Sequence, residues 1–145
     1  MVMAGVALAA FCFWYGVVRF VRMMDEREGT WLTTTGYCNC GACCGWEIAA
    51  DGSPVYSYGS MKGKPKKVGL TSSQTTAKHG TIAADPKVFA PGTRIEVPGY
   101  GRGVVEDRGG AIKGDHIDLW FPSHEEAKRW GVRRLKCAVS APPRP

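Results

Sequence analysis

The sequence predicts a mainly β protein whose strands close, or nearly close, into one small barrel. The chain has 145 residues and 44% apolar composition, which suits a single core with a short extension. All nine prolines and most of the nineteen glycines are scattered beyond the first segment, as in a fold of many short strands joined by tight turns. Only one short helical pattern follows residue 30, so long helices are not expected.

Six short runs have the alternating or apolar composition of β-strands. Asp85-Pro86 ends one of them, and the turn Pro98-Gly99-Tyr100-Gly101 separates two others. The runs predicted as strands are 31–37, 81–84, 93–97, 103–106, 117–121 and 132–139.

One short helix is predicted after the fifth strand. Ser123 and Glu126 have the spacing of a capping box, and Gly131 provides the expected stop after Trp130. Residues 51–79 are polar and rich in Gly, Ser and Lys, which indicates a long loop or a decorated hairpin.

The N-terminal segment is a candidate membrane anchor or signal peptide. Residues 1–18 contain no charged side chain. A run of eighteen residues is close to the shortest length that spans a bilayer. The lack of a basic region before this run favours an uncleaved anchor over a cleaved signal. Arg19 and Arg22 follow it, and the positive-inside rule would by itself place the later residues in the cytoplasm. The expected organisation is an anchor or signal at 1–24, a linker at 25–30, the barrel at 31–140 and a tail at 141–145.

The net charge of +6 should attract polyanions in general. Lys62, Lys64, Lys66 and Lys67 lie among glycine and proline, without interleaved aromatic residues or a helix-turn-helix pattern. A solvated basic loop is therefore favoured over a nucleic-acid contact, and no nucleic-acid partner is expected. Anionic polymers of a cell wall would also be attracted to such a surface.

Three aspartates are candidates for chemistry: Asp85, Asp107 and Asp118. A carboxyl group among apolar neighbours has a raised pKa and can donate a proton near neutral pH, which a glycosidic general acid must do. The alternative is structural, because aspartate before Pro or before Arg-Gly-Gly commonly caps a turn. This alternative is weakest for Asp118, which interrupts an otherwise apolar strand. Asp115 is expected to be solvated.

Four motifs in residues 80–139 together match a known family. They are Thr-Ile-Ala-Ala-Asp-Pro at 81–86, Pro-Gly-Thr-Arg-Ile at 91–95, Glu-Asp-Arg-Gly-Gly-Ala-Ile-Lys-Gly at 106–114 and His-Ile-Asp-Leu at 116–119. This stretch resembles the three-aspartate (3D) domain of bacterial cell-wall proteins, which also forms the C-terminal part of lytic transglycosylase A. The last motif is also similar to the His-Phe-Asp segment of expansins.

The resemblance implies a six-stranded double-psi β-barrel with one or two short helices. It also implies cleavage of the β-1,4 bond between N-acetylmuramic acid and N-acetylglucosamine, with formation of a 1,6-anhydro ring and without water or a cofactor. Asp118 would be the acid and then the base, while Asp107 and Asp85 would shape the catalytic site. The large inserted domain of lytic transglycosylase A has no counterpart here, so the groove should be shorter. The residues expected to bind the glycan are Tyr37, Thr71, Gly110, Lys113 and His116.

Cys38, Cys40, Cys43 and Cys44 lie within seven residues, and Cys137 lies in the last predicted strand. Outside the cytoplasm disulfides are the default, so pairing of Cys38 or Cys40 with Cys137 is expected. A zinc site is the alternative, but its ligands usually come as two separated pairs, and no metal is expected. A nucleophilic cysteine with His79 or His124 is less favoured still, because nothing in the sequence orients the base.

The leading hypothesis is a peptidoglycan-cleaving enzyme in the bacterial envelope, outside the cytoplasm and anchored or secreted. Its partners would be glycan strands and, through the N-terminal segment, the membrane. A wall-binding module without catalysis is the main alternative, in which the same aspartates bind sugar hydroxyls or brace loops. An intracellular nucleic-acid module is the third, and it would bind DNA with steep salt dependence.

Overall fold

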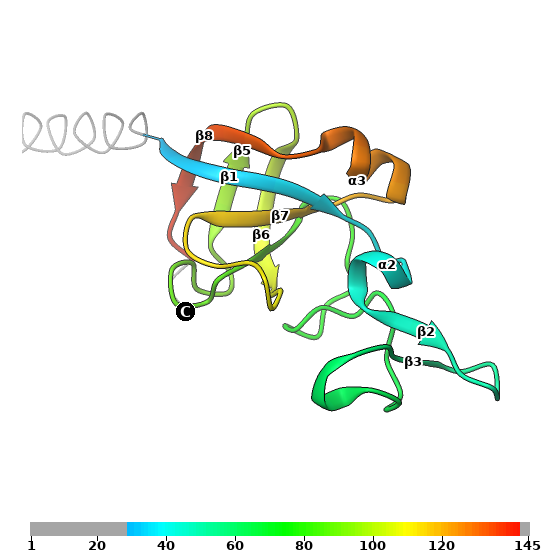
Figure 1. The fold of residues 1–145 in the computed structure, drawn as a ribbon. Helices are drawn as coiled ribbons and strands as arrows, with labels where there is room; N and C mark the ends of the chain where they lie inside the picture. The colour runs from blue at the N-terminus through cyan, green and yellow to red at the C-terminus, as the bar shows by residue number, and fades with distance from the viewer. Residues whose placement is uncertain (1–28, 143–145) are drawn as a thin grey trace, which may run out of the picture.

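The computed structural model describes residues 29–142, and six of its strands form a closed barrel (Figure 1). The barrel strands are β1 (Thr30–Tyr37), β4 (Thr81–Ala84), β5 (Arg94–Val97), β6 (Gly101–Asp107), β7 (His116–Trp120) and β8 (Arg133–Ser140). The short helix α3 (His124–Trp130) follows β7 and packs on β1. The predicted anchor or signal lies outside the described residues, as does most of the predicted linker.

The barrel has the order β1-β7-β4-β6-β5-β8, with β8 pairing back to β1. The pairs β1·β7 and β4·β6 are parallel, and the other four neighbouring pairs are antiparallel. The pairing has a twofold symmetry. If β1 is exchanged with β6, β4 with β7 and β5 with β8, every pair of neighbouring strands becomes another neighbouring pair of the same direction. This twofold pattern of two parallel pairs is that of the predicted double-psi barrel.

The core fills the barrel because alternate residues of each strand point inward. In β7, Ile117 and Leu119 are fully buried, whereas the residues on either side of them are partly exposed. Leu32 of β1 and Ile82 of β4 are also fully buried and meet them in one cluster. The closed wall therefore leaves polar side chains of β7 on its outer face.

The chain makes a long excursion between β1 and β4, at residues 38–80, which contains a small sheet away from the barrel (Figure 1). It begins with the one-turn helix α2 (Gly41–Cys44) and continues as the antiparallel pair β2 (Trp46–Ile48) and β3 (Pro54–Tyr56). A 3-10 turn at Gly59–Met61 follows. The expected decorated hairpin is thus confirmed, although it begins before residue 51.

Residues 71–75 of the excursion return to the barrel and pack against the end of β6. The backbone N–H of Ser73 donates to the Glu106 carbonyl at 3.0 Å, and Thr71 pairs with Thr75 through both backbone and side chain. This part of the excursion is therefore hydrogen-bonded to the end of β6.

The predicted strands are observed within two residues of their expected bounds. Helix α3 begins after Ser123, whose hydroxyl accepts from the Glu126 N–H at 3.2 Å, and ends at Gly131 with φ of 66°. The reciprocal half of the capping box is not formed, since Glu126 Oε2 is buried without a hydrogen-bond partner among residues 29–142. Within the same residues, no helix is long and apolar enough to cross a membrane.

The predicted disulfide between Cys38 or Cys40 and Cys137 is wrong. Cys137 is opposite Thr30 at the start of β1, whereas Cys38 follows the end of that strand. Eight residues of strand separate the two ends by about 26 Å, and a disulfide requires Cα atoms within about 7 Å. All five cysteines of the described chain are free thiols, and Cys137 is buried in the core.

The close approach of α3 to β1 depends on the glycine at position 36. A Cβ atom at Gly36 would lie 2.9 Å from the Ala127 carbonyl oxygen and 3.0 Å from the Phe121 ring. We expect Gly36→Ala to lower the free energy of unfolding by about 1–3 kcal/mol, because backbone must move to admit the methyl group. Gly110→Ala is the matched control, since nothing lies within 4 Å of its Cβ position. Urea denaturation measures both, and equal stability of the two variants would contradict the packing described.

Candidate functional site

The outer face of β7 presents Asp118 between His116 and Trp120, and all three side chains are half-buried. In the sheet, Asp118 is opposite Thr35 of β1 on one side and Ala83 of β4 on the other. Asp118 thus lies in the predicted strand, between the buried residues Ile117 and Leu119. Its side chain, however, points away from the core.

A second carboxylate follows in the same row of residues. Ala83 is opposite Asp118 on β7 and opposite Asp107 on β6. Two strand spacings place the Cα atoms of the two aspartates about 10 Å apart, with Ala83 between them in the row. Two of the three predicted aspartates therefore lie on one patch of the barrel wall.

Thr35 joins Asp118 to His116. Its hydroxyl donates to Asp118 Oδ1 at 2.7 Å, and its oxygen lies 2.8 Å from His116 Nε2. Because the single hydroxyl proton is given to Asp118, the imidazole Nε2–H must be the donor to Thr35. Thr35 was not among the predicted site residues, because its only signal in the sequence is a run of three threonines in a predicted strand.

Burial raises the pKa of Asp118 above the ordinary value for aspartate. The Thr35 hydrogen bond and the nearby His116 act in the opposite direction, and the charge of Asp107 adds to the increase. The net effect favours the protonated form. Asp118 is therefore a weaker acid than an exposed aspartate.

Asp107 is held as a hydrogen-bond acceptor from three directions. Tyr37 donates its hydroxyl to Oδ2 at 3.2 Å, and the backbone N–H groups of Ser72 and Arg108 donate to Oδ1 at 3.0 and 2.9 Å. Burial, and then the charge of Asp107, raise the pKa of Tyr37, so the phenol remains a donor. Tyr37 thus links the end of β1 to the end of β6, and the charge of Asp118 also contributes to its raised pKa.

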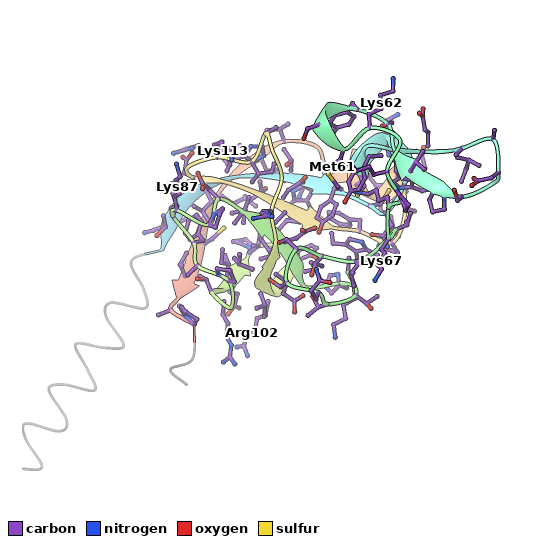
Figure 2. The ribbon with its side chains drawn as sticks, turned by 90° about the horizontal axis from the view of Figure 1, so that it is seen from below. Met61, Lys62, Lys67, Lys87, Arg102 and Lys113 are labelled. Carbon is purple, nitrogen blue, oxygen red and sulfur yellow. The ribbon has the colours of Figure 1, made fainter. Side chains whose placement is uncertain are left out.

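Asp85 has a bracing geometry. Its carboxylate accepts from the backbone N–H of Lys87 at 3.0 Å and of Gly114 at 3.2 Å. These two bonds lower its pKa, and the charges of Lys113 and Lys87, both labelled in Figure 2, act in the same direction. Asp85 therefore ties the end of β4 to the loop before β7 as a carboxylate.

The residues expected to bind glycan lie in three places. Tyr37 and His116 lie beside the two aspartates, whereas Gly110 and Lys113 are exposed in the loop between β6 and β7. Thr71 is buried and bonds to Thr75 within the returning segment of the excursion. The structure thus brings together Asp118, Asp107, Tyr37 and His116 on the barrel wall.

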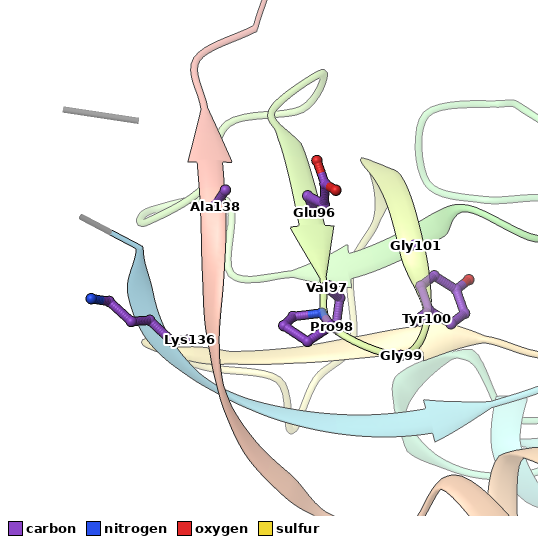
Figure 3. Close-up of a pocket in the computed structure, with 8 residues that line it drawn as sticks. All are labelled: Glu96, Val97, Pro98, Gly99, Tyr100, Gly101, Lys136 and Ala138. Atoms are coloured by element: carbon purple, nitrogen blue, oxygen red, sulfur yellow. The ribbon is translucent and has the colours of Figure 1, made fainter. Parts of the chain in front are cut away.

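The shallow pocket shown in Figure 3 lies elsewhere on the barrel. Glu96, Lys136 and the turn Pro98–Gly101 line it, on the wall formed by β5 and β8. In the order of the barrel strands, β5 and β8 are opposite β7 and β4. This pocket is therefore separate from the aspartates.

A cluster of potential metal ligands lies just beyond the end of β1. Cys38, Cys40, Cys43 and His124 each direct one ligand atom into a region where all four atoms are within 4.8 Å of one another. His124 therefore takes the place of Cys44 in the set of four cysteines that the sequence suggested as an alternative zinc site.

Comparison with known proteins confirms the predicted resemblance. Residues 80–140 match the family described as the 3D domain. The chain is 45% identical over 58 residues to the cell wall-binding protein YocH of Bacillus subtilis, a match that covers 40% of this chain and 20% of YocH. It is 43% identical over 58 residues to YabE of the same organism, whose name refers to cell wall shaping, and the match covers 14% of YabE. This chain thus matches a fifth or less of each relative.

Solved structures of E. coli MltA, a lytic transglycosylase, also align with part of the chain. MltA with bound chitohexaose gives a TM-score of 0.41 and 21% identity, over 50% of this chain and 28% of MltA. A second MltA structure gives 0.41 and 22%, over 54% of this chain and 30% of that one.

The raised pKa of Asp118 predicts how stability depends on pH. The folded protein holds this proton more tightly than the unfolded chain does, so the stabilising effect is complete below about pH 3.9 and is lost as the pH rises through the folded-state pKa. We expect Asp118→Asn, which keeps an oxygen acceptor for Thr35, to be more stable than the wild type at pH 7 by on the order of 1 kcal/mol. The difference should shrink by pH 4. Urea unfolding at both pH values tests this, and a less stable variant at pH 7 would contradict it.

Proposed function

With residues 80–140 matching the 3D domain, we propose that this protein cleaves peptidoglycan glycan strands outside the cytoplasm as a lytic transglycosylase. The observation that supports this most directly is the half-buried Asp118, whose environment favours the protonated carboxyl group on an outer face of the barrel. The cell-wall names of YocH and YabE support the location and the substrate class.

In the proposed reaction, Asp118 gives its proton to the oxygen that leaves C1 of N-acetylmuramic acid. The bond from C1 to that oxygen breaks, and the N-acetylglucosamine product departs with a free hydroxyl group. The C6 hydroxyl of the same muramic acid then forms a bond to C1, and its proton passes to the Asp118 carboxylate. The acid is restored, a 1,6-anhydro end is formed, and no water or cofactor is consumed.

The neighbouring residues would adjust this acid and hold the sugar. The charge of Asp107 raises the pKa of Asp118, which favours the protonated acid before the reaction, and it would stabilise positive charge at C1 during it. Thr35 fixes the carboxyl orientation through its 2.7 Å bond. Asp85 would act through the loop that it braces, so we assign it a positioning role rather than direct chemistry.

A wall-binding module without catalysis is the second candidate, and one observation favours it. Asp107 already accepts three hydrogen bonds and Asp85 accepts two, as braces of a rigid binding surface would. YocH is also named for binding rather than cleavage. In this case purified cell walls would retain the protein and remain uncut.

Digestion of purified sacculi separates the two candidates. The enzyme should release anhydro-muropeptides, and Asp118→Asn should lower the rate by about 10²–10⁴-fold, because a general acid contributes that much. Asp115→Asn is the matched control, since Asp115 is an exposed partner of Arg134 in the same segment and should leave the rate unchanged. Product mass analysis gives both rates. Retention of the protein on uncut sacculi would reject the enzymatic proposal and support the binding module.

Thr35→Val tests the role of the threonine in the proposed site. The Thr35 hydrogen bond lowers the pKa of Asp118, so its removal should raise that pKa further. Because the protonated acid is the active form, the decline in kcat/KM at high pH should move to higher pH. Thr33→Val is the control, since Thr33 lies on the same face of β1 but bonds to Arg134. A decline at unchanged pH would show that Thr35 does not tune the acid.

A further inference from the structure

The cysteine and histidine cluster is built by the parallel pairing of β1 and β7. Parallel strands end at the same edge of a sheet, so the segments that follow β1 and β7 become neighbours. Cys38 comes directly after β1, Cys40 caps α2, and Cys43 lies within α2. His124 is the first residue of α3, which follows β7. Ligand atoms more than eighty residues apart in sequence therefore meet.

The distances fit a tetrahedral metal site. Zinc bonds of about 2.3 Å to sulfur and about 2.0–2.1 Å to nitrogen give tetrahedral edges of about 3.8 Å between sulfurs and about 3.6 Å between sulfur and nitrogen. Cys38 Sγ lies 3.8 Å from Cys43 Sγ. His124 Nδ1 lies 3.4 Å from Cys43 Sγ and 3.5 Å from Cys40 Sγ. A disulfide would require sulfurs about 2.0 Å apart.

We propose that Cys38, Cys40, Cys43 and His124 bind one zinc ion through three thiolates and the histidine Nδ1. Three sulfur ligands and one imidazole select zinc over oxygen-preferring cations such as Mg²⁺ or Ca²⁺. Four protein ligands leave no open position, so the zinc is structural rather than catalytic. The backbone N–H of Cys40 points to Cys38 Sγ at 3.5 Å, as an outer hydrogen bond to a ligand thiolate does.

The other two cysteines of residues 29–142 have different partners and lie outside this ligand set. Cys44 Sγ donates to the Cys38 carbonyl oxygen at 3.1 Å, and Cys137 is buried in the barrel core. The zinc would join the end of β1, helix α2 and helix α3 at one point. It would thus hold the start of the excursion beside Tyr37, a role that does not depend on whether the protein cleaves or binds glycan.

Metal uptake by the full-length chain tests the proposal. The purified chain is reduced under nitrogen, freed of reductant and chelator, and titrated with Co²⁺ as a spectroscopic probe and with Zn²⁺. We expect one equivalent of cobalt with the visible bands and sulfur charge transfer of a tetrahedral thiolate site, displaced by one equivalent of zinc. His124→Ala should weaken zinc binding by more than about 100-fold, because it removes a direct ligand. Cys44→Ser is the matched control and should bind as the wild type does.

Three results would overturn the proposal. The first is a reduced wild-type chain that gives no tetrahedral cobalt spectrum, a measurement that requires no variant and so does not depend on whether a variant folds. The second is equal loss of metal by Cys44→Ser and His124→Ala. The third is a Cys38–Cys43 disulfide, identified by peptide mass analysis, in a protein that takes up no zinc after reduction.

Discussion

Strand β1 is held at both edges, by parallel pairing with β7 and antiparallel pairing with β8, and this double pairing fixes its register. Thr34 points inward, where its hydroxyl donates to the Arg133 carbonyl and accepts from the Trp130 indole N–H. Thr35 therefore points outward to Asp118. A shift of one residue would turn Leu32 out of the core and bring Trp31 or Thr33 into its place. It would also place Thr34 or Gly36 opposite Asp118 instead of Thr35. The acid, the core and the attachment of α3 thus depend on one register.

Asp118 lies on the outer wall of a closed barrel, and yet its side chain is half-buried. Because this side chain points away from the core, its burial comes from groups that lie on the outer face of the wall. Tyr37 crosses from β1 to Asp107, and residues 71–75 of the excursion bond to the end of β6. The charge of Asp118 also helps to raise the pKa of Tyr37, so this side chain is one of the groups beside the Asp118 carboxyl group. Burial raises the pKa of a carboxyl group, so partial burial favours a group that holds a proton. The same group must stay partly exposed if it is to reach a glycan.

The strands and helix α3 could be predicted because their signals are local: apolar alternation, Asp85-Pro86, and Ser123 with Gly131 as caps. The pairing of strands is not local, so only the family resemblance predicted the double-psi order. The same difference applies to the site. Asp118 and Asp107 could be selected by residue type, but Thr35 could not, because its role comes from the β1·β7 register. The expected disulfide to Cys137 was wrong for this reason too, since the antiparallel β1·β8 pairing places that residue at the far end of β1.

The position of the proposed zinc ligands and the position of the carboxylates both depend on where strand β1 ends. Cys38 follows Tyr37 directly, and Tyr37 donates to Asp107, so a constraint on the first residue limits the movement of the second. The other end of the excursion is held by hydrogen bonds to Glu106 and Asp107. A metal at Cys38 would therefore fix one end of the cover over the acidic wall, and Asp107 fixes the other. In this arrangement the excursion needs no large core of its own, because attachment at both ends replaces the packing that a segment of its size cannot supply.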